Sequence, residues 1–348
     1  MRVGVINAGS SSLKFKLIET TTKKILLSEL VENIGEEGYE IQNHNEALES
    51  LNIDFSSIDA IGHRVVHGGE VFSSAVFIDD DVEKTIESLA VLAPLHNLAN
   101  LEGIRVARNK APNIPHVAVF DTAFHATMPK EASLYAIPYE LYEKHNIRRY
   151  GFHGTSHAYV TKEAACTLLK DVNDVNLITL HLGNGASACA IENGKSIDTS
   201  MGFTPLEGLM MGSRSGDVDP AIVFHMHREL GMSIESIEDV LNKESGLLGI
   251  CQENDLRKVL KSKNEKAKLA LDMMVRRIQK YIGGYLALLG SVDAIVFTGG
   301  IGENSSYIRE AVMSSPLLKN IKFLSIKTNE ELEIANETAE LIGGATNG

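Results

Sequence analysis

The feature that most constrains the fold of this chain is a strand–loop–strand pattern that occurs twice. Residues 3–6 are apolar, residues 7–12 form a loop of small polar residues, and residues 13–18 alternate between apolar and mainly lysine side chains. An alternation with a period of two predicts a β-hairpin. A related pattern returns at residues 177–192, in the second half of the chain. The recurrence indicates an internal duplication of one α/β domain.

Helical patterns follow the hairpins. Asp219 as the N-cap, Pro220 in the first turn and Gly231 at the end predict a helix within residues 219–231. Apolar residues at steps of three and four predict a long amphipathic helix over 271–289. A strand is predicted at 293–297, and residues 328–331 have the sequence of a capping box at the start of a last helix. Strands that alternate with helices predict an α/β class. A length of 348 residues without a low-complexity linker predicts two domains packed around a cleft.

Composition excludes several classes of partner. The formal net charge of −13 argues against bulk binding of nucleic acid or anionic membrane surfaces, although a few focused arginines can still hold a small anion. Three scattered cysteines, Cys166, Cys189 and Cys251, make no disulfide framework and no CxxC metal site. The start of the chain has no signal-peptide pattern, and the apolar stretch 281–300 is interrupted by polar residues. We therefore expect a cytoplasmic protein with no membrane partner.

Three loops of small residues could approach a phosphate. Residues 7–12, followed by Lys14, and residues 183–185 lie at the predicted hairpin tips, while residues 299–302 follow a predicted strand. Backbone N–H groups in such loops can cradle phosphate oxygens, but each hairpin tip could equally be an ordinary turn. The chain has no Walker A loop, no GxGxxG fingerprint after its first strand and no protein-kinase signature. A nucleotide site would therefore be of another type.

Two arginines and one aspartate are candidates for a role in catalysis. Arg64 precedes a Gly-Gly turn, and Arg214 lies among serine and glycine residues, where a guanidinium can lie flat against a carboxylate or phosphate. The alternative is a structural arginine paired with an acid. Asp121 ends the apolar strand 117–120, a common place for a catalytic carboxylate, and the alternative there is a cap or turn residue.

His153 and His157 have the i, i+4 spacing of a helical zinc pair. Gly154 lies between them and no HExxH glutamate is present, so a metal pair is disfavoured. A single histidine that donates a hydrogen bond to a transferring group is the better hypothesis. Glu330, within the predicted capping box, is most simply an acid of a first helical turn.

Taken together, these motifs resemble the acetokinase (acetate kinase) family. The resemblance extends in family order over nearly the whole chain, through the strings NAGSSSLKFKL, GHRVVHGGE, LAPLHN, VFDTAFH, YGFHGTSH, HLGNGAS, GFTPLEGLMMGSRSGDVDP, VFTGGIGENS and TNEELEIA. The family belongs to the acetate and sugar kinase, heat-shock chaperone and actin superfamily. The resemblance implies two duplicated ribonuclease-H-like (actin-like ATPase) domains around a central cleft. The first would comprise residues 1–124 plus 330–348, and residues 125–329 would form the second, with the nucleotide site and a dimer interface.

The activity that the resemblance implies is a reversible, Mg²⁺-dependent phosphoryl transfer from ATP to acetate, giving ADP and acetyl phosphate. Mn²⁺ would be a possible substitute for Mg²⁺, the transfer would be direct and in line, and the enzyme would be a homodimer. A transferring phosphoryl group spreads negative charge over its equatorial oxygens, so catalysis consists mainly of positioning and charge stabilisation. Arginines and a histidine suit that requirement.

The resemblance also implies a role for each matched residue. Arg64, Arg214 and His153 would stabilise the transition state, and Asp121 would orient and activate the acetate oxygen. The acetate pocket would comprise Arg64, Val66, Leu95, Phe152 and Pro205. The ATP site would comprise Lys14, His181, Leu182, Gly183, Asn184, Gly185, Asp255, Leu256, Arg257, Gly300, Ile301, Gly302, Glu303 and Asn304. Asn7 and Glu330 would lie around Mg²⁺.

The chain departs from the family in some places, and three other functions compete. It lacks material between about residues 29 and 53 and between about residues 316 and 327. Propionate or butyrate kinase is the nearest alternative, because one methylene in an apolar pocket is worth only about 1–3 kcal/mol. A nucleotide-gated binding or filament protein would explain the phosphate loops but not the placement of the arginines. A metallohydrolase would use some of the histidines 125, 153, 157 and 181.

Overall fold

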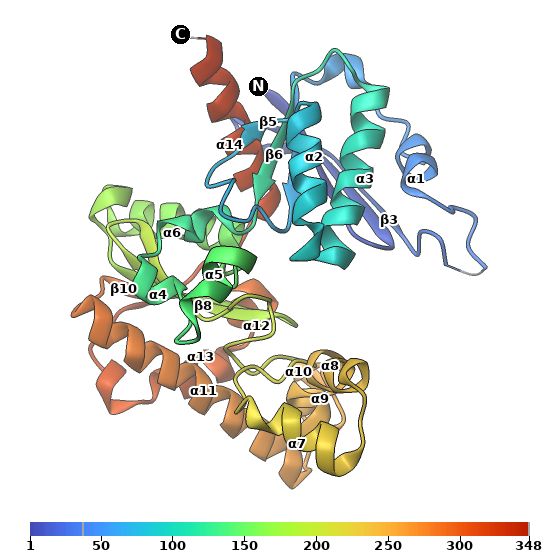
Figure 1. Ribbon diagram of the computed structural model, residues 1–348. Coiled ribbons are helices and arrows are strands. Elements are labelled where there is room, and N and C mark those ends of the chain that lie inside the picture. The colour runs from blue at the N-terminus through green and yellow to red at the C-terminus, as the bar shows by residue number, and fades with distance from the viewer. Residues whose placement is uncertain (37, 347–348) are drawn as a thin grey trace. The chain divides into compact units, whose positions relative to one another are not determined.

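The computed structural model describes residues 1–36 and 38–346, which belong to two compact units (Figure 1). Unit 1 comprises Met1–Ala126, Gly154–Ser156 and the segment that begins at Asn329. Unit 2 comprises Thr127–His153 and His157–Thr328. The last described helix of the chain therefore belongs to the unit that contains the N-terminus.

Unit 1 is built on a six-stranded sheet in the order β3-β2-β1-β4-β6-β5. Its strands are β1 (Arg2–Ala8), β2 (Ser12–Glu19), β3 (Lys24–Glu32), β4 (Ala60–Val65), β5 (Val76–Phe77) and β6 (His116–Phe120). The antiparallel pair of β1 and β2 confirms the first predicted hairpin. Strand β4 runs parallel to β1, and β6 runs parallel to β4. The carboxyl ends of these three parallel strands therefore lie at one edge of the sheet.

Helices cover the sheet of unit 1. They are α1 (His44–Ser50), α2 (Asp80–Ser88), α3 (Pro94–Lys110) and α14 (Glu330–Thr346). Figure 1 shows α2 and α3 side by side, and α3 packs on β1 and β4. Helix α14 approaches β4 so closely that a Cβ at Gly62 would lie only 2.9 Å from Ile334. Ile61, which alternates with Gly62 along β4, belongs instead to the core that includes Ala107 of α3.

Unit 2 contains a five-stranded sheet in the order β11-β10-β7-β8-β9. Its strands are β7 (Leu177–Leu182), β8 (Ala186–Glu192), β9 (Lys195–Thr199), β10 (Ala294–Thr298) and β11 (Phe323–Ser325). Its helices, with α6 beginning in the short segment Gly154–Ser156, are α4 (Lys130–Ser133), α5 (Tyr139–His145), α6 (Gly154–Leu168), α7 (Ala221–Leu230), α8 (Ile234–Lys243), α9 (Gly246–Cys251), α10 (Leu256–Val259), α11 (Glu265–Leu289), α12 (Gly299–Asn304) and α13 (Ser306–Met313). The pair of β7 and β8 confirms the second predicted hairpin.

The two sheets share one topology. In each, three consecutive strands form an antiparallel meander, and two later strands extend the sheet in parallel from the first strand of the meander. Thus β1, β2, β3, β4 and β6 correspond in order to β7, β8, β9, β10 and β11. This correspondence confirms the predicted α/β class with two duplicated ribonuclease-H-like domains.

The predicted helices are present, with one correction at a helix start. Helix α7 ends at Leu230, before Gly231 with φ of +67°, and α11 contains the predicted apolar stripe. The capping box assigned to residues 328–331 is wrong in detail. Helix α14 begins at Glu330, and the side chain of Asn329 accepts the N–H of Leu332 at 3.2 Å, so Asn329 rather than Thr328 caps it. No helix in the described parts of the chain is long and apolar enough to cross a membrane.

Candidate active site

Three of the predicted site residues of unit 1 meet at the carboxyl ends of its parallel strands. Arg64 near the end of β4 donates from Nε to Asp121 Oδ1 at 3.2 Å and from Nη2 to Asp121 Oδ2 at 2.5 Å. Its Nη1 also donates to Asn7 Oδ1 of β1 at 3.4 Å. Asp121, directly after β6, is 1% exposed. The parallel register of the strands therefore brings an amide, a guanidinium and a carboxylate together.

The backbone around Asp121 explains one glycine of the sequence. The carbonyl oxygen of Asp121 accepts the N–H of Gly154 at 2.9 Å, at the start of α6. A Cβ at position 154 would overlap that same carbonyl oxygen, so only glycine fits. Thr155 then donates its hydroxyl to Asp121 Oδ1 at 3.2 Å. Sequence reasoning did not single out Thr155, which gives the buried carboxylate a second donor.

An acidic pair from α14 lies beside these groups. Burial raises the pKa of Glu330, with Asp121 and Glu331 acting in the same direction, while Arg64 and Lys14 oppose the shift. Glu331 forms ion pairs with Lys14 and with Lys16 of β2, the latter at 3.2 Å. Lys14 is thus held by an acid of its own unit, a contact between residues 317 positions apart that no local pattern predicts.

In unit 2, His153 and Arg214 converge on one glycine. A Cβ at Gly185 would lie 3.5 Å from Arg214 Nη1 and 3.5 Å from His153 Nε2. Arg214 also donates from Nη1 to the carbonyl oxygen of Pro205 at 3.2 Å. The guanidinium of Arg214 is partly buried, and this burial lowers its pKa because it disfavours the charged form. Phe152, next to His153, is 4% exposed.

His153 is held in an unusual backbone conformation. Its φ of +58° lies in the left-handed region, which non-glycine residues seldom adopt and which is often found at functional sites. Its ring stacks on His181 with centroids 4.2 Å apart. The hydroxyl of Ser187 lies 2.9 Å from His153 Nδ1 and 2.8 Å from His157 Nε2, so one serine engages both rings. Sequence reasoning missed Ser187, because nothing local marks a serine within a strand.

A cavity of about 660 Å³ in unit 2 gathers much of the predicted ATP site. It is lined by Gly183, Asn184, Asn254, Asp255, Leu256, Arg257, Leu260, Gly300, Ile301, Asn304 and Ser305. The β7–β8 turn, the start of α10 and helix α12 thus contribute to one pocket. Asn254, Leu260 and Ser305 were not predicted. The guanidinium of Arg257 lowers the pKa of Asp255 to about 2, through hydrogen bonds as short as 2.7 Å.

The remaining predicted residues lie as follows. Glu303 accepts the N–H groups of Gly299 at 3.1 Å and of Thr328 at 3.0 Å, so its carboxylate secures the start of α12 to the segment that precedes α14. Gly302 is buried within α12, and Leu182 ends β7. In unit 1, Val66 donates its backbone N–H to Asn100 Oδ1 at 3.0 Å. Leu95 belongs to α3, and its side chain lies outside the described part of the structure.

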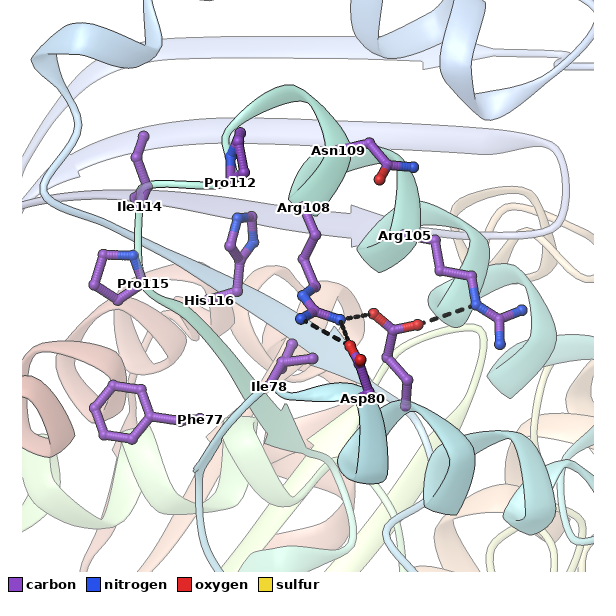
Figure 2. Close-up of a pocket in the computed structure, with 11 residues that line it drawn as sticks. Phe77, Ile78, Asp80, Arg105, Arg108, Asn109, Pro112, Ile114, Pro115 and His116 are labelled. Atoms are coloured by element: carbon purple, nitrogen blue, oxygen red, sulfur yellow. Dashed lines mark hydrogen bonds and ion pairs between the residues drawn. The ribbon is translucent and has the colours of Figure 1, made fainter.

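A second cavity, of about 580 Å³, lies in unit 1 and contains none of the predicted site residues (Figure 2). Arg108 forms ion pairs with Asp80 and Glu83 there, and Arg105 donates to Glu83 at 3.1 Å. His116 lines the same cavity and lies 2.9 Å from His63 through its Nδ1 atom. Because acids already engage both arginines, we assign no ligand to this cavity.

The donor chemistry of unit 1 can be tested against Mg²⁺. Within residues 1–36 and 38–346, no three histidine, cysteine, aspartate or glutamate side chains gather as a ready-made metal cage. Mg²⁺ is usually held by one or two protein oxygen ligands together with water and substrate phosphates. The amide oxygen of Asn7 and the carboxylate of Glu330 are ligands of that kind, and both are associated with Arg64. The residues present therefore fit the ion.

The chain is also similar to known proteins. The sequence profile of the acetokinase family matches residues 2–56 and 43–342. An acetate kinase of Sulfurimonas denitrificans is 51% identical over 387 residues, which cover 98% of this chain and 100% of the relative. Because that alignment is longer than the chain, the relative holds segments that this chain lacks.

Solved structures are also similar. The crystal structure of an acetate kinase from Porphyromonas gingivalis superposes with a TM-score of 0.93 at 39% identity, covering 98% of this chain and 99% of that one. A propionate kinase from Francisella tularensis superposes with a TM-score of 0.91 at 43% identity, covering 97% and 99%. These identities and coverages are sufficient to assign the family: the chain belongs to the acetokinase family.

Proposed function

We propose that this protein is an acetate kinase, which transfers a phosphoryl group reversibly between ATP and the carboxylate of acetate. The observation that carries the proposal is the convergence of Arg214 and His153 on Gly185. Gly185 adjoins Gly183 and Asn184, which line the cavity of unit 2. Two donors thus lie beside the hairpin tip that borders the best candidate for a nucleotide pocket. The name and the 51% identity of the Sulfurimonas relative support the choice of substrate.

Arg214 and His153 act on the phosphoryl group in flight. Negative charge spreads over the equatorial oxygens during transfer, so preorganised donors in a water-poor site stabilise the transition state. Arg214 is already partly desolvated, and His153 is fixed by Ser187 and by stacking on His181. Little reorganisation is needed when the charge develops.

Arg64 and Asp121 act on the acceptor. Arg64 supplies a cationic donor for the acetate carboxylate, and Asp121 orients that donor through two hydrogen bonds. Acetate is already ionised at pH 7, so it needs no general base. Asp121 is therefore an orienting residue rather than a proton acceptor.

Mg²⁺ and the nucleotide have separate sets of residues. Asn7 and Glu330 would hold Mg²⁺, which neutralises phosphate charge when bound. Mn²⁺ prefers the same oxygen ligands and would substitute. Lys14, His181, Asn184 and Gly185 would follow the phosphates.

We assign the adenosine part of the nucleotide to the 660 Å³ cavity. The methyl group of acetate would contact Val66, Leu95, Phe152 and Pro205. Leu182, Gly302 and Glu303 would shape the nucleotide site through the backbone. We also propose that the enzyme is a cytoplasmic homodimer, with the dimer interface in residues 125–329.

The proposal is tested by incubating the purified protein with Mg-ATP, acetate and hydroxylamine. Acetyl phosphate reacts with hydroxylamine to give acetyl hydroxamate, which is measured by its colour with iron. We expect hydroxamate that depends on ATP, Mg²⁺ and acetate together. No hydroxamate with any short carboxylate, under conditions where ATP binds, would contradict the enzyme assignment and favour a nucleotide-gated binding protein.

Propionate kinase is the second candidate, because the Francisella structure with that name superposes at a TM-score of 0.91. The two activities are separated by kcat/KM for acetate, propionate and butyrate. An acetate kinase should turn over acetate best, with a preference of about 10- to 200-fold per added methylene when the pocket is tight. A higher kcat/KM for propionate would make the second candidate correct.

A further inference from the structure

A largely buried guanidinium in unit 2, that of Arg149, binds the segment that follows β9. Arg149 Nη1 donates to three successive carbonyl oxygens, those of Thr199 at 3.0 Å, Ser200 at 3.2 Å and Met201 at 3.1 Å. Its Nη2 donates to Glu207 Oε1 at 2.6 Å. The side chain of Arg149 is only 16% exposed. Arg149 therefore binds both ends of the loop 199–207: its start at Thr199 and its end at Glu207.

A tyrosine closes the same loop from the other side. The hydroxyl of Tyr135 donates to Glu207 Oε2 at 2.5 Å and accepts the backbone N–H of Phe203 at 2.9 Å. Burial and the neighbouring Glu207 raise the pKa of Tyr135, so the hydroxyl stays protonated and remains a donor. Every polar atom named in this contact has a partner. The contacts are partly buried, and polar networks in which every group has a partner rigidify the backbone that they connect.

The loop 199–207, which Arg149 and Tyr135 contact, is hydrogen-bonded to the segment that precedes His153. The carbonyl oxygen of Gly202 accepts the N–H groups of Tyr150 at 3.1 Å and of Gly151 at 3.3 Å. A Cβ at Gly202 would overlap the side-chain ends of Glu207 and Tyr135, so a larger residue there would displace both from their contact. Two hydrogen bonds thus link the loop 199–207 to the backbone of Tyr150 and Gly151, which directly precede Phe152.

The same loop carries Pro205, whose carbonyl oxygen accepts Arg214 Nη1 at 3.2 Å. Pro205 lies between the Tyr135 contact at Phe203 and the Arg149 contact at Glu207. The contacts of Phe203 and Glu207 therefore flank the residue whose carbonyl oxygen accepts a hydrogen bond from Arg214. Tyr135, Arg149 and Glu207 are not among the residues that line the 660 Å³ cavity.

We infer that Tyr135, Glu207 and Arg149 form a positioning network that fixes Phe152 and Pro205 as two walls of the acyl pocket. This inference rests on the proposed function and adds to it the origin of chain-length selectivity. A pocket discriminates against a longer acyl chain only if its lining residues cannot move away to make room for the added methylene. Hydrogen bonds restrict the movement of the loop that carries such a residue. The network therefore sets the preference for acetate over longer carboxylates.

The kinetic test compares Tyr135→Phe with Glu207→Gln and with the wild type. Loss of the Tyr135 hydroxyl leaves the N–H of Phe203 and one oxygen of Glu207 without a partner, so the loop loosens. We expect the ratio of kcat/KM for acetate to that for propionate to fall by about tenfold, within the range of one methylene. We expect KM for acetate to rise, with KM for ATP unchanged. Glu207→Gln keeps an acceptor for Arg149 and should show a smaller effect.

Tyr285→Phe is the matched control. Tyr285 is buried in the same unit, but its hydroxyl donates to the carbonyl oxygen of Ala188 in β8 at 3.4 Å rather than to the loop. It should leave the acetate-to-propionate ratio unchanged. An unchanged ratio in folded Tyr135→Phe, or an equal fall in Tyr285→Phe, would overturn the inference. Loss of the folded state in both Tyr135→Phe and Glu207→Gln would also overturn it, since the network would then serve folding and not the pocket.

A second measurement does not depend on turnover. Amide hydrogen exchange followed by mass spectrometry reports the opening of residues 148–153 and 199–207 separately. In Tyr135→Phe both segments should exchange faster together, with α11 unchanged. Faster exchange in 199–207 alone would contradict the link through Gly202. An inactive wild type whose two segments still respond together would reject the proposed function while retaining the network.

Discussion

Arg64 of β4 donates two hydrogen bonds to Asp121, which directly follows the adjacent parallel strand β6: Nε to Oδ1 at 3.2 Å and Nη2 to Oδ2 at 2.5 Å. The aspartate is 1% exposed, whereas the arginine side chain retains 23% exposure. The two partners of the ion pair therefore differ in their access to solvent. Its carboxylate depends on the guanidinium, and the guanidinium still has a face that a substrate can reach.

The first prediction concerns stability. Arg64→Ala leaves a buried carboxylate without its main partner, and a fully buried pair loses about 3–5 kcal/mol in such cases. Because Arg64 is partly exposed, we expect a loss of about 2–4 kcal/mol in the free energy of unfolding, measured by urea titration. The double variant Arg64→Ala/Asp121→Asn should recover part of that loss. Equal stability of the single variant and the wild type would show that the pair contributes nothing.

The second prediction concerns His153. Its φ of +58° suits asparagine better than most residues, so His153→Asn should fold with a stability within about 1 kcal/mol of the wild type. The imidazole donor would be lost, and removing one preorganised donor typically costs 10²–10³ in kcat. We therefore expect kcat to fall by roughly 100-fold with KM for ATP little changed. A kcat within threefold of the wild type would remove His153 from the proposed chemistry.

The third prediction concerns acid stability. Burial lowers the pKa of His67 from 6.5 to about 4. Below about pH 6.5 the unfolded state binds a proton that the folded state does not, so this contribution is complete above pH 6.5 and is lost as the pH falls towards 4. In His67→Asn the side-chain oxygen can still accept the N–H of Gly69, which His67 Nδ1 accepts at 3.0 Å.

Between pH 7.5 and pH 4.5, the unfolding free energy of wild type should therefore fall by about 2–3 kcal/mol more than that of His67→Asn. Urea titrations of both proteins at each pH provide the comparison. Parallel pH profiles of the two proteins would mean that His67 does not titrate as described.

The fourth prediction concerns the nucleotide cavity. Arg257 lines it, while the adjacent Lys258 instead forms an ion pair with Glu253 at 3.2 Å. Under the proposed assignment, Arg257 would contact the adenosine part of ATP, which does not change during transfer, so Arg257→Ala should raise KM for ATP about tenfold and leave kcat unchanged. Lys258→Ala is the control on the same helix and should leave both constants near their original values. A lower kcat with an unchanged KM in Arg257→Ala would contradict the assignment of this cavity to the nucleotide.

Several parts of the fold follow from local pattern. Alternation over residues 13–18 predicts β2, and the register of the observed hairpin pairs Asn7 with Lys14. The apolar steps of α11 predict its buried face, which includes Leu271, Ile278 and Ile282. These features are legible because each depends on residues close in the sequence.

Other features depend on distant residues and are not legible in this way. Thr328 and Asn329 are both good capping residues, so the local sequence does not tell which of them caps α14. The neighbouring contacts are made with distant residues: Glu303 accepts the N–H of Thr328, and Glu331 forms ion pairs with Lys14 and Lys16. The contact of Tyr135 with Glu207 spans 72 residues. The grouping of Asn7, Arg64 and Asp121 came from the family resemblance, and parallel pairing of β1, β4 and β6 is its physical reason.

The central claim is that desolvated cationic donors stabilise the phosphoryl group during transfer to a carboxylate. The most direct measurement is kcat for acetate phosphorylation by Arg214→Ala, beside Arg105→Ala from the other cavity as the control. Arg105 is 45% exposed and pairs with Glu83 and Glu87, so its loss should change kcat by less than about twofold. We expect Arg214→Ala to lose about a thousandfold in kcat. Near-normal turnover by folded Arg214→Ala would contradict the claim.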